Sequence, residues 1–270
     1  MSFRRIVFGL GAEPAERALA AAMEIARATE AALLGLFVEE RELLDLAGLP
    51  FAREVAFPAA TGRALDTASM GRALRARAQA AQARLASSLA GATLQWRFEV
   101  VRGSATTAVL EAAGERDLAV ISLTAGVRVD AARTRAAALR GVRQARRAAL
   151  LLGPRSVPRA PLVAVLAPGA SPRETLAALG ALARSYDGVG VDVLALPGSA
   201  GDAELDAAAQ ALGLRLRTRR LESAAHLPDA LVQASAGLVV LAGGEGIWEI
   251  GDALTECASC PLLVLPGPAG

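Results

Sequence analysis

The sequence contains no lysine and no asparagine, so all 29 of its basic residues are arginines. Without lysine, a Schiff-base enzyme and a P-loop that grips phosphate with a lysine are both excluded. We attribute the abundance of arginine to a GC-rich genome rather than to a polyanionic partner. The formal net charge is only +2, which is too small to indicate binding to a nucleic acid.

Aromatic residues, cysteines and histidines are also scarce: aromatics make up 3% of the chain, and there are two cysteines and one histidine. Hydrophobic residues still reach 53%, which allows sizeable cores built from Ala, Leu and Val. No apolar run approaches the roughly 18 residues of a membrane-spanning helix. The apolar run after Arg4 and Arg5 is too short for a signal peptide. Two neighbouring cysteines cannot form a disulfide that stabilises a chain of 270 residues. Because stabilising disulfides are typical of proteins in oxidising compartments, we expect a cytoplasmic protein.

The same order of strands and helices occurs twice along the chain. The first half opens with an apolar run at 6–8, a helix with Pro14 near its start, and a second apolar run at 32–38. The second half repeats this with a strand at 162–166, a helix that Ser171 and Pro172 cap, and a strand at 189–196. Each half reads βαβαβαβαβ, which favours a doubly wound parallel sheet. The Pro- and Gly-rich stretch 153–160 predicts two domains, 1–153 and a shorter one at 160–270.

One strand in each half alternates apolar and polar residues instead of being uniformly apolar. These are "TLQWRFEVV" (93–101) and "LRLRTRRLE" (214–222). Alternation in an otherwise parallel design is typical of a half-exposed strand, so we place both at sheet edges.

The stretches "VRGSATTAVLEAAGERDLAVIS" (101–122) and "ASCPLLVLP" (258–266) resemble the universal stress protein family, and the order of elements resembles its tandem form over nearly the whole chain. The resemblance implies two doubly wound, five-stranded parallel sheet domains with strand order 3-2-1-4-5, an adenine nucleotide alpha hydrolase-like fold. That order places the third strand at an edge. Members of the family pair their domains two by two, and a tandem chain can supply such a pair internally.

The nucleotide-binding motif of that family is degenerate in this chain. Nucleotide-binding members carry an Asp after the first strand, and G-x-x-G, nine residues and G-[ST] after the fourth. Both halves here lack the Asp, and in the first half the two early glycines fall on Ser122 and Ala125. We therefore expect no bound cofactor, and ATP is the alternative.

The second half keeps more of the motif's glycines, in "AGGEGIWEIGDAL". The candidate cofactor-binding residues are Gly243, Gly244, Gly246 and Gly251. One interpretation is an anion or nucleotide loop, in which glycines let backbone amides approach phosphate. The other, which we favour, is a tight strand-to-helix turn, because only four residues separate Gly246 from Gly251 and Asp252 would repel a triphosphate.

The two cysteines, Cys257 and Cys260, have C-x-x-C spacing but follow a helix predicted at about 246–258. A redox C-x-x-C lies at a helix N-terminus, where the dipole stabilises a thiolate, so we expect structural packing here. A metal would need two further ligands, and His226 is the only histidine. We expect His226 to be a surface or capping residue at the start of a helix, and we predict no metal site and no catalytic residue.

Two further segments have alternative interpretations. Six arginines share one predicted helix and form either a basic patch or a solvated face: Arg133, Arg135, Arg140, Arg143, Arg146 and Arg147. The segment 40–66 has no counterpart in the second half and carries apolar residues, namely Leu43, Leu44, Leu49, Phe51 and Phe57. It is either a short helix packed on its own domain or a lid or docking surface, and we predict that it covers the carboxyl ends of the first-half strands.

Together these patterns predict a non-enzymatic, cytoplasmic, regulatory or protective protein that acts through contacts with an unidentified protein partner. A homodimer of tandem chains is possible under this interpretation, and no nucleic acid or membrane partner is expected. The alternative is an adenine-nucleotide-binding, weakly hydrolysing stress protein that uses the second-half glycines.

Overall fold

The computed structural model describes residues 3–10, 15–40, 45–46, 48–49, 53–56, 61–64, 67–123, 131–153, 157–183, 190–244, 246–257 and 260–267. In chain order its elements are β1 (Arg5–Gly9), α1 (Ala15–Thr29), β2 (Ala32–Glu40), β3 (Arg53–Ala56), β4 (Thr61–Ala64), α3 (Thr67–Ser88), β5 (Trp96–Gly103), α4 (Ala105–Ala112), β6 (Asp117–Ser122), α5 (Ala131–Ala145), β7 (Ala148–Leu152), β8 (Leu162–Leu166), α6 (Pro172–Ala183), β9 (Gly190–Ala195), α7 (Asp202–Leu212), β10 (Arg215–Arg220), α8 (Leu227–Gln233), β11 (Leu238–Gly243), α9 (Ile247–Cys257) and β12 (Leu262–Pro266).

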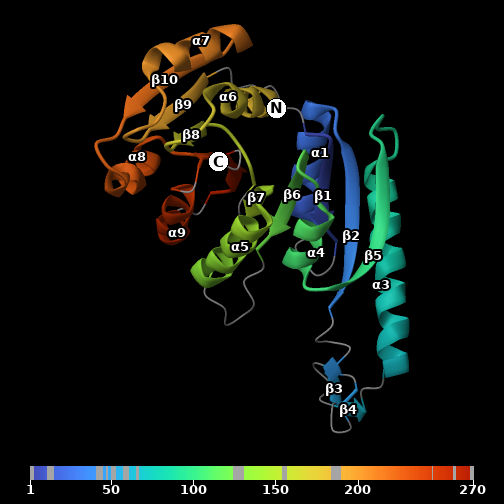
Figure 1. Cartoon of the computed structure of the whole chain (residues 1–270). Helices are drawn as coiled ribbons and strands as arrows, with labels where there is room; N and C mark the ends of the chain where they lie inside the picture. The colour runs from blue at the N-terminus through green and yellow to red at the C-terminus, as the bar shows by residue number, and fades with distance from the viewer. Residues whose placement is uncertain are drawn as a thin grey trace.

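Ten strands form one sheet in the order β10-β9-β8-β11-β12-β7-β6-β1-β2-β5 (Figure 1). Within each half the order is 3-2-1-4-5 and all pairs are parallel, which confirms the predicted fold class. The halves meet where β7 and β12 pair antiparallel, with Leu262 opposite Leu151. Because both halves share one sheet, the division into domains at 153 and 160 stays a prediction.

Helices cover both faces of this sheet. One buried cluster joins the sheet to α1, α3, α6 and α7, and the other joins it to α4, α5, α8 and α9. Across the junction α1 contacts α6 on one face, and α5 contacts α9 on the other. Central strands such as β7 and β8 are buried on both faces, as their continuous apolar runs predict. In the described part of the chain, no helix combines the length and the apolarity that a membrane crossing requires.

Both alternating strands lie at the edges of the sheet, as their pattern predicts. In β5, Trp96 and Phe98 pack on the core while Arg97 and Glu99 are exposed. In β10, Leu216 packs on the core and its neighbours are exposed. The polar residues therefore face water, which is how native proteins protect an open sheet edge.

The described part of segment 40–66 does not lie across the ends of the first-half strands. Its β3–β4 hairpin stands beyond the end of β2, close to the start of α3 and apart from the main body (Figure 1). Leu46 and Leu49 are 48% and 40% exposed, so they bury little against the domain. The covering role predicted for this segment is thus wrong for these residues. Four other residues of the prediction lie outside the described ones: Leu43, Leu44, Phe51 and Phe57.

Candidate functional site

The predicted glycine loop of the second half lies where β11 gives way to α9. Gly243 closes β11 with a φ of 155°, a conformation that residues with a side chain rarely adopt. A Cβ at Gly243 would lie 2.7 Å from Ile247 Cγ2 and 2.9 Å from Ala167 Cβ. Glycine is needed here because the turn packs tightly against the segment after β8.

The amide of Gly244 in this turn already has a partner within the protein. The amide of Gly244 donates to the carbonyl oxygen of Pro168 at 2.9 Å, and the amide of Gly267 donates to that of Gly243 at 2.7 Å. A Cβ at Gly169, which follows β8, would come within 3.2 Å of the Gly244 amide nitrogen. The glycines therefore let three strand ends approach one another, and the amide of Gly244 is not free to donate to a phosphate.

The remaining two candidate glycines, Gly246 and Gly251, do not lie together in one phosphate-binding loop. Gly246 lies in the turn before α9, and a Cβ there would meet no atom within 4 Å. Gly251 lies inside α9, where a Cβ would contact Leu139 of α5 and Leu241 of β11 at 3.5–3.6 Å. This position serves the packing of α9 on α5 across the junction and does not fit phosphate binding.

Buried apolar residues follow the first strand of each half, where nucleotide-binding members of the family carry Asp. Leu10 follows β1 and is 5% exposed, and Ala167 follows β8 and is fully buried. The amide of Leu10 donates to the carbonyl of Leu36 at 2.6 Å, and that of Ala167 to the carbonyl of Ala242 at 3.0 Å. Neither position offers a polar side chain to a ligand.

Cys260 is half-buried just before β12, beside Arg135 of α5. Burial raises the pKa of the Cys260 thiol above its ordinary 9.0, and the positive charge of Arg135 offsets only part of this rise. The thiol is therefore protonated at neutral pH. Cys257 ends α9, as predicted, and its side chain lies outside the described residues.

The six arginines predicted on one helix do not form a single face. Arg135 is 5% exposed and its Nη2 donates to the carbonyl oxygen of Cys260 at 3.1 Å, so it links the two halves. Burial lowers the pKa of Arg135 because a buried guanidinium loses its hydration. Arg146 and Arg147 follow the end of α5, and Arg147 Nε donates to the carbonyl of Ala113 at 3.0 Å. A surface role is therefore wrong for the buried Arg135, whereas Arg133, Arg140 and Arg143 of α5 are exposed, as a solvated face requires.

His226 is exposed and directly precedes α8, as predicted. Its Nδ1 lies 3.4 Å from the hydroxyl oxygen of Ser223, and its side chain makes no capping hydrogen bond. Among the residues that the structure describes, no group of three or more His, Cys, Asp or Glu side chains is arranged to hold a metal ion.

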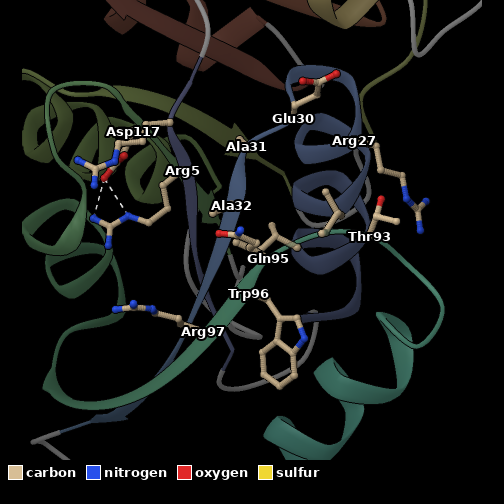
Figure 2. A pocket seen from close by; sticks show the side chains of 13 residues that line it. Arg5, Arg27, Glu30, Ala31, Ala32, Thr93, Gln95, Trp96, Arg97 and Asp117 are labelled. Carbon is tan, nitrogen blue, oxygen red and sulfur yellow. Dashed lines mark hydrogen bonds and ion pairs between the residues drawn. The ribbon is translucent and has the colours of Figure 1, made fainter.

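Sequence reasoning missed a cavity of about 1000 Å³ at the amino ends of β1, β2, β5 and β6. Figure 2 shows its lining, in which the Arg5 side chain faces that of Asp117, while the side chains of Arg97, Trp96 and Arg27 point in different directions. The sequence feature that indicated this cavity is the charged start of two strands, with Arg4 before β1, Arg5 in β1 and Asp117 in β6. Parallel pairing of β1 with β6 brings these two strand starts side by side. The register places Arg5 directly opposite Asp117.

Comparison with known proteins supports the fold but gives no sequence relative. No protein-family model and no curated protein sequence matches the chain. A universal stress protein from Archaeoglobus fulgidus is similar in structure, with a TM-score of 0.61 over 97% of this chain and 96% of that one, at 10% identity. The cytoplasmic domain of a prokaryotic cation chloride cotransporter aligns over 98% of this chain and 95% of that one, with a TM-score of 0.49 at 11% identity. The chain therefore has the fold of a universal stress protein, with both five-stranded units in one polypeptide.

Proposed function

We propose that this chain is a cytoplasmic, non-enzymatic stress protein that regulates or protects through contacts with another protein, without a nucleotide at the carboxyl ends of its strands. The observation that carries this proposal is the closed turn after β11. The amide of Gly244 is bonded to Pro168, and Gly243 has no room for even a methyl group. A phosphate would have to break these contacts before it could reach the backbone.

The first half supports the same conclusion for the end of β1. Leu10 occupies the position after that strand, and a Cβ at Gly35 of β2 would lie 2.8 Å from its Cδ1. An apolar side chain therefore fills the space beside the strand ends. Leu46 and Leu49, which precede the β3–β4 hairpin in the chain, are exposed and are available to a protein partner.

Calorimetric titration with Mg·ATP tests this proposal, together with the absorbance at 260 nm of the freshly purified protein. We expect no excess absorbance, no binding at micromolar concentrations and no release of phosphate from ATP. The matched control is Gly246→Asp, which adds a carboxylate to the turn at a position with open space. Micromolar ATP binding that Gly246→Asp abolishes would refute the proposal and favour the nucleotide-binding alternative.

A further inference from the structure

β10 ends the sheet on the side of the second half, and its outer backbone groups have no partner strand (Figure 1). Among the described strands only β9 pairs with β10, and the amide of Leu221 donates to the carbonyl of Ala195 in β9 at 2.9 Å. Successive residues of a strand direct their N–H and C=O groups to alternate sides, so the odd-numbered residues of β10 face β9. The residues whose backbone groups face outward are the even-numbered ones: Leu216, Thr218 and Arg220.

The side chains on one face of β10 form a row of arginines. Leu216 packs on the buried cluster that includes α6 and α7, so the odd-numbered side chains lie on the opposite face of the sheet, the face that α8 covers. These side chains are all exposed: Arg215, Arg217 and Arg219. Neighbours in the row are roughly 7 Å apart, because a strand rises about 3.3 Å per residue.

Among the described residues, a carboxylate neutralises only the middle arginine of this row. Arg217 donates to the two carboxylate oxygens of Asp192 in β9, at 2.7 and 3.0 Å. Arg219 donates to the neutral side-chain oxygen of Gln233 in α8 at 2.6 Å. Within the described part of the chain, the Arg215 side chain makes no hydrogen bond or ion pair. Two unneutralised positive charges therefore lie four residues apart on one face.

Protection of an open edge does not by itself explain this row. Charges of either sign on an edge strand discourage pairing with another chain. The opposite edge strand, β5, carries both signs, with Glu99 beside Arg97, and Glu39 of β2 pairs with its Arg102 at 3.0 Å. β10 carries four arginines and no acidic residue. It therefore repels a basic strand and attracts an acidic one.

We propose that the outer edge of β10 binds an extended acidic peptide as an additional strand, with two acidic residues four positions apart in the peptide. The peptide backbone pairs with the outward groups of the strand around Thr218. The two carboxylates lie opposite Arg215 and Arg219, where side chains of neighbouring strands are about 4.5–5.5 Å apart.

Other occupants fit this edge less well. A second copy that presented its own β10 would place arginines opposite arginines, and one that presented β5 would offer a single carboxylate, that of Glu99. A nucleic acid would neutralise the arginines, but its backbone does not pair with the N–H and C=O groups of a strand. An acidic peptide matches both the charges and the unpaired backbone.

Three capped seven-residue peptides of threonine and valine are the probes, titrated by calorimetry into the full chain at low ionic strength. The first has glutamate at its second and sixth positions, which places both carboxylates on one face of a strand. The second has glutamate at its second and fifth positions, which places them on opposite faces. The third has glutamine in place of both glutamates of the first. We expect saturable binding of the first peptide, weaker binding of the other two, and slower amide exchange at 216–220 in the complex.

Variants of the arginine row test the charge contacts. Arg215→Ala and Arg219→Ala should each weaken binding of the first peptide about threefold, because a cross-strand pair of opposite charges contributes modestly. The matched control is Arg97→Ala, at an exposed arginine of the other edge strand, which should leave the affinity unchanged. Arg215→Glu combined with Arg219→Glu should exchange the preference, so that a peptide with lysine at the same two positions binds instead.

Thr218→Pro tests the backbone pairing. Proline removes the outward N–H of this residue and no N–H that faces β9, and an edge strand tolerates it there. We expect loss of peptide binding, whereas Thr218→Ala, which keeps the N–H, should bind like the parent. Circular dichroism verifies that each variant is folded.

Three results would overturn the proposal: no saturable binding, equal binding of the two glutamate peptides, or equal binding by Thr218→Pro and Thr218→Ala. An oligothymidylate that binds more tightly than the peptide, and that Thr218→Pro does not weaken, would also overturn it and assign the edge to a nucleic acid.

This inference rests on the proposed function in one respect, because it gives a chemistry to the protein contact, and the two fail separately. Absence of peptide binding together with absence of ATP binding would overturn the assignment of β10 alone. Micromolar ATP binding that Gly246→Asp abolishes, with peptide binding unchanged, would overturn the nucleotide-free function and leave the β10 site in place.

Discussion

The two halves of the sheet match in their strands and differ in how the strand ends are closed. In the first half, the register pairs Arg5 with Asp117, and the amino ends stay open around this ion pair. In the second half, Leu162 of β8 pairs with Leu238 of β11. The residues directly before these two, Pro161 and Gly237, are the counterparts of Arg5 and Asp117. There the chain before β8 folds onto Gly237, whose amide donates to the carbonyl of Pro161 at 2.9 Å.

This difference shows which parts of a repeated fold can diverge. A strand that is buried on both faces must remain apolar, so both halves keep runs of Val, Leu, Ile and Ala. A strand end touches water and connecting segments, and it tolerates either a charged pair or a glycine. Binding properties can therefore change at the strand ends while the sheet stays the same.

The largest expected effect comes from filling the closed amino end of the second half with Gly237→Ala. The added Cβ would collide with the carbonyl oxygens of Arg159 and Ala160, which are backbone atoms and cannot rotate away. We expect a loss of about 3 kcal/mol in the free energy of unfolding, measured by urea denaturation. Gly201→Ala, where a Cβ meets no atom within 4 Å, is the control and should change stability by about 0.5 kcal/mol or less. If the two substitutions have similar effects, the amino end is not closed as described.

An intermediate effect is expected when the ion pair of the first half is broken by Asp117→Ala. The change removes three hydrogen bonds from a nearly buried carboxylate and leaves Arg5 without its partner. The Arg5 side chain is 36% exposed and can reach water, so we expect a loss of about 2 kcal/mol in urea denaturation.

The matched control for this prediction is Asp192→Ala in the second half. Asp192 accepts two hydrogen bonds from Arg217, at 2.7 and 3.0 Å, but the Arg217 side chain is 84% exposed. Exposed pairs contribute little, and we expect a change of about 0.5 kcal/mol. Equal losses in the two variants would show that burial does not distinguish the two halves.

The smallest expected effect concerns the thiol of Cys260 at the junction of the halves. Its pKa in the folded protein is raised, so between 9.0 and that raised value only the unfolded chain loses the proton. The stability contributed by the protonated thiol is complete below about pH 9 and is lost as the pH rises through the folded pKa. In a Cys257→Ser background, we expect native Cys260 to react more slowly with iodoacetamide at pH 8 than the urea-unfolded chain does. Equal rates would contradict the burial of this thiol.

The sequence was sufficient to predict the ten strands of the main sheet, their order within each half and the two edge strands, but not the β3–β4 hairpin. Apolar runs, alternation at 93–101 and 214–222, and the repeat itself all depend on local pattern, and the resemblance supplied the order 3-2-1-4-5. The partnership of Arg5 and Asp117 was out of reach, because it joins residues 112 positions apart and depends on the register of two strands. The sequence also left open whether the second-half glycines bind a ligand or serve packing. A glycine that lets a phosphate approach the backbone looks the same in sequence as one that lets another backbone segment approach.

The burial of Arg135 was within reach of a more careful helix analysis. Arg135, Leu139 and Val142 are spaced by four and three residues and therefore share one face of α5. All three are buried against the second half or the sheet. The pattern placed an arginine in an apolar stripe, and the missing information was its acceptor, the carbonyl of Cys260.

The antiparallel junction of β7 and β12 has a consequence for how the protein responds to dilution. Two separate chains joined through their fifth strands would dissociate as their concentration falls, because their pairing follows mass action. In this chain both fifth strands belong to one polypeptide, so each meets its partner at a fixed, high effective concentration. The paired state is therefore independent of how many copies a cell contains. A second copy that joined the sheet edge to edge would have to use the outer strands, β5 or β10.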